Sequence, residues 1–191
     1  MNLATAGDFL IIDLEATCWE DGNFDERGHR KSEVIELGGV LYRSKEGVLL
    51  DFSQIVKPFL NPILSDFCTK LTTITQEMVD SAPYFQEGFN RIKPIVMATE
   101  PIFTSWGDYD NNLLRDEFHR YKMRWPFPFH LNLKRLFGKR HARGALLSEV
   151  DALAWIGLNF EGQHHRGVDD AKNSARILEW MIRQELEPGK P

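Results

Sequence analysis

The sequence predicts an α/β fold in which a mixed five-stranded sheet carries helices on its faces. Three strand-length apolar segments open the chain, turn signals separate them, and helical and strand-like periodicities alternate after Pro58. Three antiparallel strands followed by alternating helices and strands are typical of a mixed sheet that helices cover. The 191 residues fit a single domain spanning 1–191.

The first three strands are expected at residues 8–14, 34–42 and 48–57, where apolar runs of strand length occur. The stretch SKEG at 44–47 is a turn signal between the second and third runs. We therefore predict that these two strands form a hairpin and that all three strands pair antiparallel.

The rest of the chain is predicted to alternate between helices and two further strands. The strands are expected at 101–106 and 129–133. Helices are expected as two short pieces within 65–83, and at 85–97, 110–122, 133–138, 147–156 and 169–186. Thr75 is a candidate N-cap for the second short piece, whereas Gly88 and Pro94 weaken the prediction at 85–97.

Taken alone, the net charge of −5 argues weakly against a nucleic-acid binder, because phosphate affinity comes from Lys and Arg. The charge is nevertheless uneven. Residues 122–148 contain seven Lys or Arg and no Asp or Glu. The basic stretch from Lys134 to Arg143 is therefore a candidate for contacting substrate phosphates, with an ordinary solvated surface as the alternative.

Composition also limits the cellular setting. No apolar run approaches the roughly 20 residues needed to span a bilayer, so no membrane partner is expected. No basic segment precedes the first apolar run, which argues against a signal peptide. Two cysteines, Cys18 and Cys68, are too few for a disulfide framework or a zinc site. We therefore expect a reducing, cytoplasmic location.

Asp13 and Glu15 flank Leu14 at the end of the first predicted strand. Side chains alternate along a strand, so both carboxylates are expected on one face and Leu14 on the other. Two neighbouring acids on a buried strand repel each other and lose hydration, a cost that a bound cation removes. For this pair alone, a solvated strand end is the alternative interpretation.

Two more segments offer acids near the start of a predicted helix. Asp108 and Asp110 precede one helix, and Asp169 and Asp170 begin the last one. Within each pair, one acid could instead cap its helix. His165 precedes Asp170 by five residues and is a candidate general base, because the ordinary pKa of histidine is about 6.5. A histidine that packs within a loop is the alternative.

This combination of carboxylates favours divalent cations. Hard cations such as Mg²⁺ take oxygen ligands and need few protein carboxylates when a substrate phosphate supplies the rest. Two ions about 3.5–4 Å apart can activate a water molecule on one side and stabilise a leaving oxygen on the other. The pattern therefore indicates metal-dependent chemistry on a phosphate ester.

The motifs resemble those of the DEDDh, or DnaQ-like, 3′→5′ exonucleases, over nearly the whole chain. The matching motifs are, in order, IDLEAT at 12–17, GDYD at 107–110 and HRGVDD at 165–170. The segments EVIELGGVLY, LSDFCTKLTTIT and HLNLKRLF resemble in addition the Eri- and KapD-like exoribonuclease branch.

The resemblance implies a ribonuclease H-like fold, two Mg²⁺ or Mn²⁺ ions, and release of 5′-nucleoside monophosphates from the free 3′ end of a nucleic acid. It favours RNA over DNA as the substrate. The four metal-site acids correspond to Asp13, Glu15, Asp110 and Asp170, and the general base corresponds to His165. The neighbours Asp108, His164 and Asp169 stay open as alternatives at their positions.

Five residues are candidates for contacting the terminal nucleotide. Backbone groups of Ala16 and Thr17, just beyond the acids, are candidates for binding its ribose. Stacking against its base, worth roughly 1–3 kcal/mol, is assigned by position to Phe67, Leu71 and Tyr109. Packing in the core is the alternative for Phe67 and Leu71.

Other functions remain possible from the sequence. An exonuclease acting on single-stranded DNA would use the same chemistry, because discrimination of the 2′-hydroxyl depends on a few contacts. A non-catalytic nucleic-acid-binding regulator is disfavoured by the complete set of acids and histidine. A ribonuclease H-like endonuclease is disfavoured by the spacing of His165 and Asp170. The sequence is compatible with a monomer or a homodimer.

Overall fold

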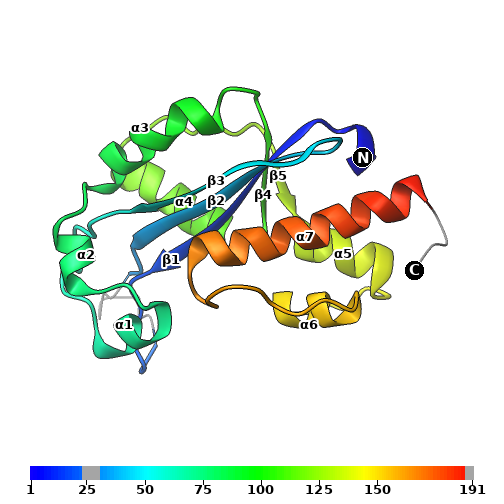
Figure 1. Ribbon diagram of the computed structural model, residues 1–191. Helices are drawn as coiled ribbons and strands as arrows, with labels where there is room; N and C mark the ends of the chain where they lie inside the picture. Colours follow the sequence, from blue (N-terminus) through cyan, green and yellow to red (C-terminus); the bar gives the residue numbers. More distant parts are fainter. Residues whose placement is uncertain (23–30, 188–191) are drawn as a thin grey trace.

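The computed structural model describes residues 1–22 and 31–187, and a five-stranded sheet runs through them (Figure 1). The strands are β1 (Asp8–Ala16), β2 (Val34–Arg43), β3 (Gly47–Ile55), β4 (Ile102–Ser105) and β5 (His130–Asn132). Their order across the sheet is β3-β2-β1-β4-β5. The first three strands pair antiparallel, whereas β4 runs parallel to β1 and β5 parallel to β4. The predicted mixed sheet is therefore confirmed.

The α-helices lie close to their predicted positions, and a short 3₁₀ helix, η1 (Leu3–Thr5), precedes β1 where none was predicted. The α-helices are α1 (Asp66–Thr72), α2 (Gln76–Asp80), α3 (Phe85–Val96), α4 (Tyr109–Arg120), α5 (Leu133–His141), α6 (Glu149–Trp155) and α7 (Gly167–Leu186). Thr75 caps α2 as predicted, because its side chain accepts a hydrogen bond from the Met78 N–H. Pro94 is accommodated in the last turn of α3. Within the described residues, no helix combines the length and apolar character needed to cross a bilayer.

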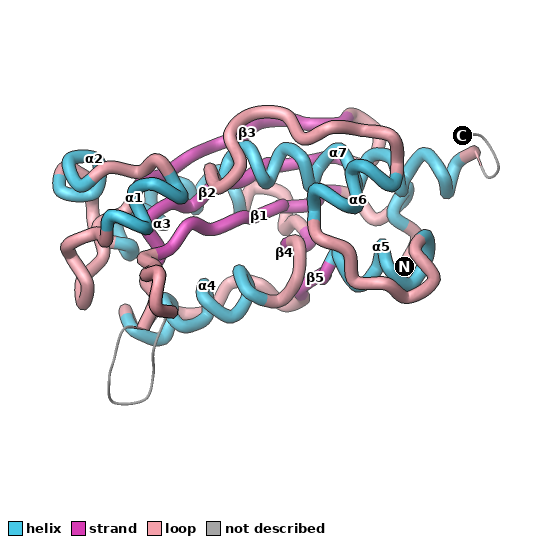
Figure 2. Tube along the Cα trace, turned by 90° about the horizontal axis from the view of Figure 1, so that it is seen from below, coloured by secondary structure: helices cyan, strands magenta, loops and turns pink. Residues whose placement is uncertain are grey.

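The helices form two layers around the sheet. Figure 1 shows α7 lying along one face, with α5 and α6 beside it, and α3 beyond the other face. Figure 2, turned by 90°, shows α1 and α2 near one end of the sheet and α5 and α6 near the other. One apolar core fills the space under α7, and a second lies between the sheet and the helices α3 and α4.

Strand β1 divides its side chains between the two cores. Phe9 and Ile11 pack in the core under α7, whereas Ile12 and Leu14 pack in the opposite core. This is the alternation expected of an extended chain. Asp13 therefore continues the row that faces α7, and so does Glu15 two residues later. The apolar part of that row ends where the two acids begin.

Candidate metal and catalytic site

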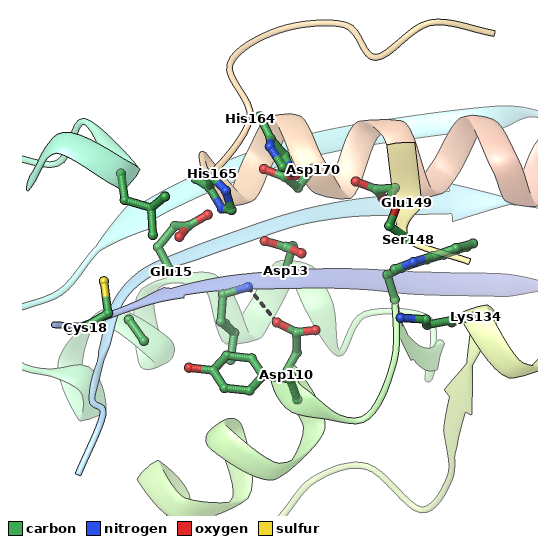
Figure 3. Close-up of a pocket in the computed structure, with 15 residues that line it drawn as sticks. Asp13, Glu15, Cys18, Asp110, Lys134, Ser148, Glu149, His164, His165 and Asp170 are labelled. Carbon is green, nitrogen blue, oxygen red and sulfur yellow. Dashed lines mark hydrogen bonds and ion pairs between the residues drawn. The ribbon is translucent and has the colours of Figure 1, made fainter. Parts of the chain in front are cut away.

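Three carboxylates converge between the end of β1 and the start of α7. One oxygen each of Asp13, Glu15 and Asp170 lies within 4.8 Å of the other two. Figure 3 shows these side chains pointing toward one another from β1 and α7. Glu15 and Asp170 are buried, and Asp13 is partly buried. The alternative interpretation of Asp13 and Glu15 as acids at a solvated strand end is therefore wrong.

Asp110 reaches the same pocket from the first turn of α4 because the sheet narrows beside it. Strand β4 pairs with β1 only from Phe9 to Ile11, so the later part of β1 has no strand on that side. The Leu14 N–H, which would otherwise lack an acceptor, donates to Asp110 Oδ1 at 3.0 Å. This bond links the acid directly to the strand residue between Asp13 and Glu15.

The neighbouring acid, Asp108, has a different role. It occupies the N-cap position of α4, but its side chain makes no capping hydrogen bond. Its Oδ1 accepts from Asn132 Nδ2 at 2.8 Å, and its Oδ2 forms an ion pair with Arg135 at 2.7 Å. The structure therefore brings Asp110, and not Asp108, among the residues that line the pocket.

Glu36 on β2, a buried acid outside the pocket, fixes the start of α7. Glu36 Oε2 accepts from the Gly167 N–H at 3.1 Å and from Arg166 Nε at 3.1 Å. Asp170 Oδ2 in turn accepts from the Arg166 N–H at 3.1 Å. Helix α7 thus begins at Gly167, two residues before the expected start, with Arg166 as its N-cap residue. This geometry holds Asp170 above β1.

The early start of α7 puts Asp169 near the cap of the helix but not at the N-cap position, which Arg166 occupies. Asp169 lies within the first turn of α7. Its Oδ2 accepts from the Gln163 N–H at 2.8 Å, which ties down the loop before the helix. Asp169 does not line the pocket, whereas Asp170 does.

Both adjacent histidines line the pocket. The ring of His164 places Nε2 3.5 Å from Asp170 Oδ1, and the two histidine rings lie 4.0 Å apart, centre to centre. Figure 3 shows His165 near Glu15. His165 has the left-handed backbone angle φ of 64°, which few residues other than glycine adopt. Burial, with the neighbouring His164 charge, lowers the pKa of His165 and favours its neutral form.

Sequence reasoning missed one acid, Glu149, in the first turn of α6. It is buried, lines the same pocket, and accepts a hydrogen bond from Ser174 Oγ at 2.5 Å. In the sequence, an acid at this position is indistinguishable from one that serves the helix dipole. Only the packing of α6 against α7 places Glu149 beside Asp170.

The acids of the pocket are shifted toward their protonated forms. Burial and the Asp170 charge raise the pKa of Glu15 to about 9. Burial raises the pKa of Asp110 to about 7 and that of Asp170 to about 6. Burial and the charges of its neighbours raise the pKa values of Asp13 and Glu149 well above their usual range. A cation between these carboxylates would remove the repulsion.

The donor set fits a hard divalent cation. The three converging groups offer carboxylate oxygens only, which Mg²⁺ and Mn²⁺ prefer over soft metals. The described lining includes a single Lys or Arg, Lys134, so the negative charge is largely uncompensated by the protein. Cysteine Cys18 also lines the pocket, but it does not belong to the cluster of converging ligand atoms.

The five candidate substrate contacts divide into two groups. Ala16, Leu71 and Tyr109 line the pocket, and the Tyr109 side chain is 54% exposed. Thr17 does not line it. Its N–H donates to the Glu33 carbonyl oxygen at 2.9 Å, its hydroxyl accepts from the Glu33 N–H, and the residue is buried.

Phe67 also lies outside this pocket. Its side chain is 38% exposed and lines a neighbouring hollow with Trp19 and Ser65. The core alternative for Phe67 is therefore wrong, and its contact with a terminal base stays a prediction that would involve a surface next to the acid pocket. Trp106 also lines the pocket, and it is partly buried against the core under α7. Leu71 follows Phe67 by one turn of α1, and of the two only Leu71 lines the acid pocket.

The fold and the carboxylate pocket together define a class. A sheet of this order, with acids from β1, α4 and α7 meeting above it, is the ribonuclease H-like fold of the DEDDh exonucleases. The chain belongs to the exonuclease family described as RNase_T, whose sequence profile matches residues 10–178.

Individual relatives support this assignment. The chain is 34% identical over 202 residues to human ERI1 exoribonuclease 2, covering 91% of the chain but 28% of the relative. It is 32% identical over 196 residues to the 3′-5′ exonuclease Snipper of Drosophila melanogaster, covering 91% and 69%. The chain thus spans less than a third of the length of the ERI1 exoribonuclease 2 relative.

Solved structures agree with the sequence relatives. The nuclease domain of 3′hExo, a DEDDh family member bound to rAMP, superposes with a TM-score of 0.81 at 29% identity, covering 94% of each chain. The cell-death related nuclease 4 (CRN-4) superposes with a TM-score of 0.82 at 25% identity, covering 93% of this chain and 64% of that one. The predicted ribonuclease H-like fold is therefore confirmed.

Proposed function

We propose that this protein is a metal-dependent 3′→5′ exonuclease that removes 5′-nucleoside monophosphates from RNA. The observation that carries the proposal is the convergence of Asp13, Glu15, Asp110 and Asp170 with a histidine pair in one pocket. The names of the relatives, which include 3′-5′ exoribonucleases and exonucleases, support the reaction and favour RNA. A structure of a related 3′-exonuclease recognising the end of a histone mRNA stem-loop supports the same substrate.

We assign the carboxylates to two Mg²⁺ or Mn²⁺ ions. Asp13, Glu15 and Asp170 would hold one ion, and Asp13 with Asp110 would hold the second. Such ions lower the pKa of an attacking water molecule and offset the charge that develops on the phosphate and the leaving 3′ oxygen. The Leu14 N–H bond keeps Asp110 at the edge of β1, which fixes its distance from Asp13.

His165 is proposed to accept the proton of the attacking water. Its lowered pKa keeps the ring neutral near pH 7, so a nitrogen lone pair is free for this task. The Glu36 bonds to Arg166 and Gly167 hold the adjacent backbone in place. His164, 3.5 Å from Asp170, is assigned to orienting that carboxylate instead.

The terminal nucleoside is proposed to sit at the end of the pocket that Ala16, Leu71 and Tyr109 line. Leu71 and the exposed ring of Tyr109 offer apolar surface against which a base can stack. Such stacking tolerates every base, because each base has a flat face. Thr17 and Phe67 are omitted from this assignment, since neither lines the pocket.

The deciding experiment uses matched single-stranded RNA and DNA oligonucleotides, labelled at the 5′ end, with Mg²⁺, Mn²⁺ or EDTA. We expect a ladder of shortened RNA, 5′-nucleoside monophosphates as the released product, slower loss of DNA, and no reaction in EDTA. A circular RNA of the same sequence should resist. Cleavage of the circle, or no metal-dependent shortening of the linear RNA, would refute the proposal.

We also propose that residues 1–191 act as one exonuclease domain in a reducing, cytoplasmic compartment. Both cysteines are free thiols, so the fold needs no disulfide. Limited proteolysis should leave one stable core, and a tagged chain should distribute through the cytoplasm. Two separately stable fragments, or a tagged chain confined to an oxidising compartment, would contradict this.

A further inference from the structure

The two ends of the carboxylate pocket differ in charge. Glu15 and Cys18 lie at one end of the pocket, and neither side chain carries a positive charge. The opposite end carries Lys134, the only Lys or Arg among the described lining residues. Figure 3 shows Cys18 and Lys134 on opposite sides of the acids, with the amino end of Lys134 turned toward Asp110.

Two of the other basic side chains on α5 form ion pairs elsewhere. Arg135 pairs with Asp108 at 2.7 Å. Arg140 pairs with Glu185 and donates to the Met1 carbonyl oxygen at 2.7 Å. Lys139 is exposed in the last turn of the helix. Lys134 is therefore the one member of the basic stretch Lys134–Arg143 among the residues that line the pocket.

The distribution of charge along the RNA indicates which end of the pocket suits its terminal nucleoside and which suits its upstream chain. A terminal nucleoside adds a base, a sugar and hydroxyl groups but no charge beyond the phosphate that is cleaved. Every linkage on its 5′ side adds one negative charge. The end without a cation therefore suits the terminal nucleoside, and the Lys134 end suits the chain that continues upstream.

We propose that Lys134 binds the phosphodiester immediately 5′ of the one that is cleaved. This rests on the proposed exonuclease function. A lysine ammonium is a compact charge on a flexible stem, so it can follow successive linkages as the RNA shortens by one nucleotide at a time. The contact also requires at least two linkages in the substrate, so a dinucleotide would lack it.

The test is a double-mutant cycle between protein and substrate. Lys134→Gln and wild type are each assayed on RNA with a normal or an uncharged methylphosphonate linkage at that single position. We expect either change alone to raise KM, or Kd in the inactive Asp13→Asn background, about 10-fold. Lys134→Gln and the methylphosphonate together should raise KM or Kd little more than either change alone. The salt dependence of binding should flatten by a slope of about 0.7 in Lys134→Gln.

Lys139→Gln on the same helix is the matched control, and it should leave affinity at wild-type levels or nearly so. Fully additive losses in the cycle, or coupling to a methylphosphonate at a different linkage, would overturn the assignment. Failure of the exonuclease function is distinguished separately, because wild type would then not shorten unmodified RNA. The binding cycle in the Asp13→Asn background can be read in either case.

Discussion

Gly38 on β2 and Gly167 at the start of α7 meet backbone to backbone. A Cβ atom on Gly38 would lie 2.0 Å from the carbonyl carbon of Gly167, and one on Gly167 would lie 2.7 Å from the Asp13 carbonyl oxygen. No side chain fits between them. The absence of both Cβ atoms lets α7 begin directly above β1 and β2, which is what brings Asp170 to Asp13.

Gly38→Ala should therefore push the start of α7 away from the sheet. We expect a loss of about 1–3 kcal/mol in the free energy of unfolding from overpacking. Activity should fall by roughly 10²-fold, because an ångström of misplacement in the catalytic groups is enough for such a loss. Thermal melting and kcat/KM on a labelled RNA measure the two effects.

Gly39→Ala is the control for this change. The three atoms nearest to its Cβ would all belong to the ring of Phe52, the first at 2.3 Å, on the face away from α7. A comparable loss of stability with nearly normal activity per folded molecule is expected there. Equal activity losses in the two variants would show that the contact between Gly38 and Gly167 has no special role in positioning Asp170.

Local patterns were enough to predict much of the fold and several residues of the pocket. The alternation around Leu14 predicts that Asp13 and Glu15 share a face, and apolar runs predict the five strands because strand periodicity is a local property. The spacing of His165 and Asp170 predicts that both residues lie near one site, and they do, because they flank the start of the same helix.

Residues whose placement depends on distant contacts could not be predicted. Glu149 reaches the pocket only because α6 packs on α7, and the N–H of Thr17 is unavailable because it bonds to Glu33. The N-cap of α7 is Arg166 rather than an acid, because Glu36 on another strand satisfies the helix start. Such tertiary contacts override local preferences for capping.

Removing divalent ions should make stability depend on pH in a defined direction. The pKa of Glu15 is about 9, that of Asp110 about 7 and that of Asp170 about 6, all raised above their ordinary values. The folded state thus holds protons that the unfolded state releases between about pH 4 and pH 9, so stability falls as pH rises through that range. Melting temperatures in EDTA from pH 5 to pH 8 should decline.

Adding Mg²⁺ or Mn²⁺ should reverse that decline. At 100 times the dissociation constant, one bound ion adds about 2.7 kcal/mol, or about 5–11 °C in Tm for a chain of this size. Asp13→Asn should melt higher than wild type in EDTA, because it removes a carboxyl group whose ionised form the neighbouring acids repel, and should gain little from metal. A wild-type Tm that ignores divalent ions would contradict the assigned metal centre.

The two histidines should differ in their effects on the reaction. His165→Ala should lower kcat by roughly 10²–10⁴-fold if this ring accepts the proton. His164→Ala should cost less, since His164 is assigned to orienting Asp170 and not to accepting the proton. Rate profiles against pH separate the roles: the acidic limb, set by a pKa below the usual histidine value, should disappear in His165→Ala and persist in His164→Ala. The opposite pattern would reverse the assignment.

Glu149 is expected to strengthen metal binding through its charge. It is buried beside Asp170 and accepts from Ser174 Oγ, so glutamine can replace it with nearly the same shape and a retained partner for Ser174. Glu149→Gln should raise the Mg²⁺ concentration for half-maximal activity by about 10–100-fold, the usual cost of changing a group that supports metal ligands. The rate at saturating Mg²⁺ should recover most of its wild-type value.

The matched control for Glu149 is Glu87→Gln, which removes an exposed acid of α3 that pairs with Arg91. Its Mg²⁺ requirement should equal that of wild type. If Glu149→Gln has the same Mg²⁺ requirement as wild type, then the carboxylate acts only through packing, and Glu149→Ala should be the variant that loses activity. A low rate that extra Mg²⁺ cannot restore in Glu149→Gln would instead point to a displaced Asp170, because the hydrogen-bonded acid then positions its neighbour rather than adding charge.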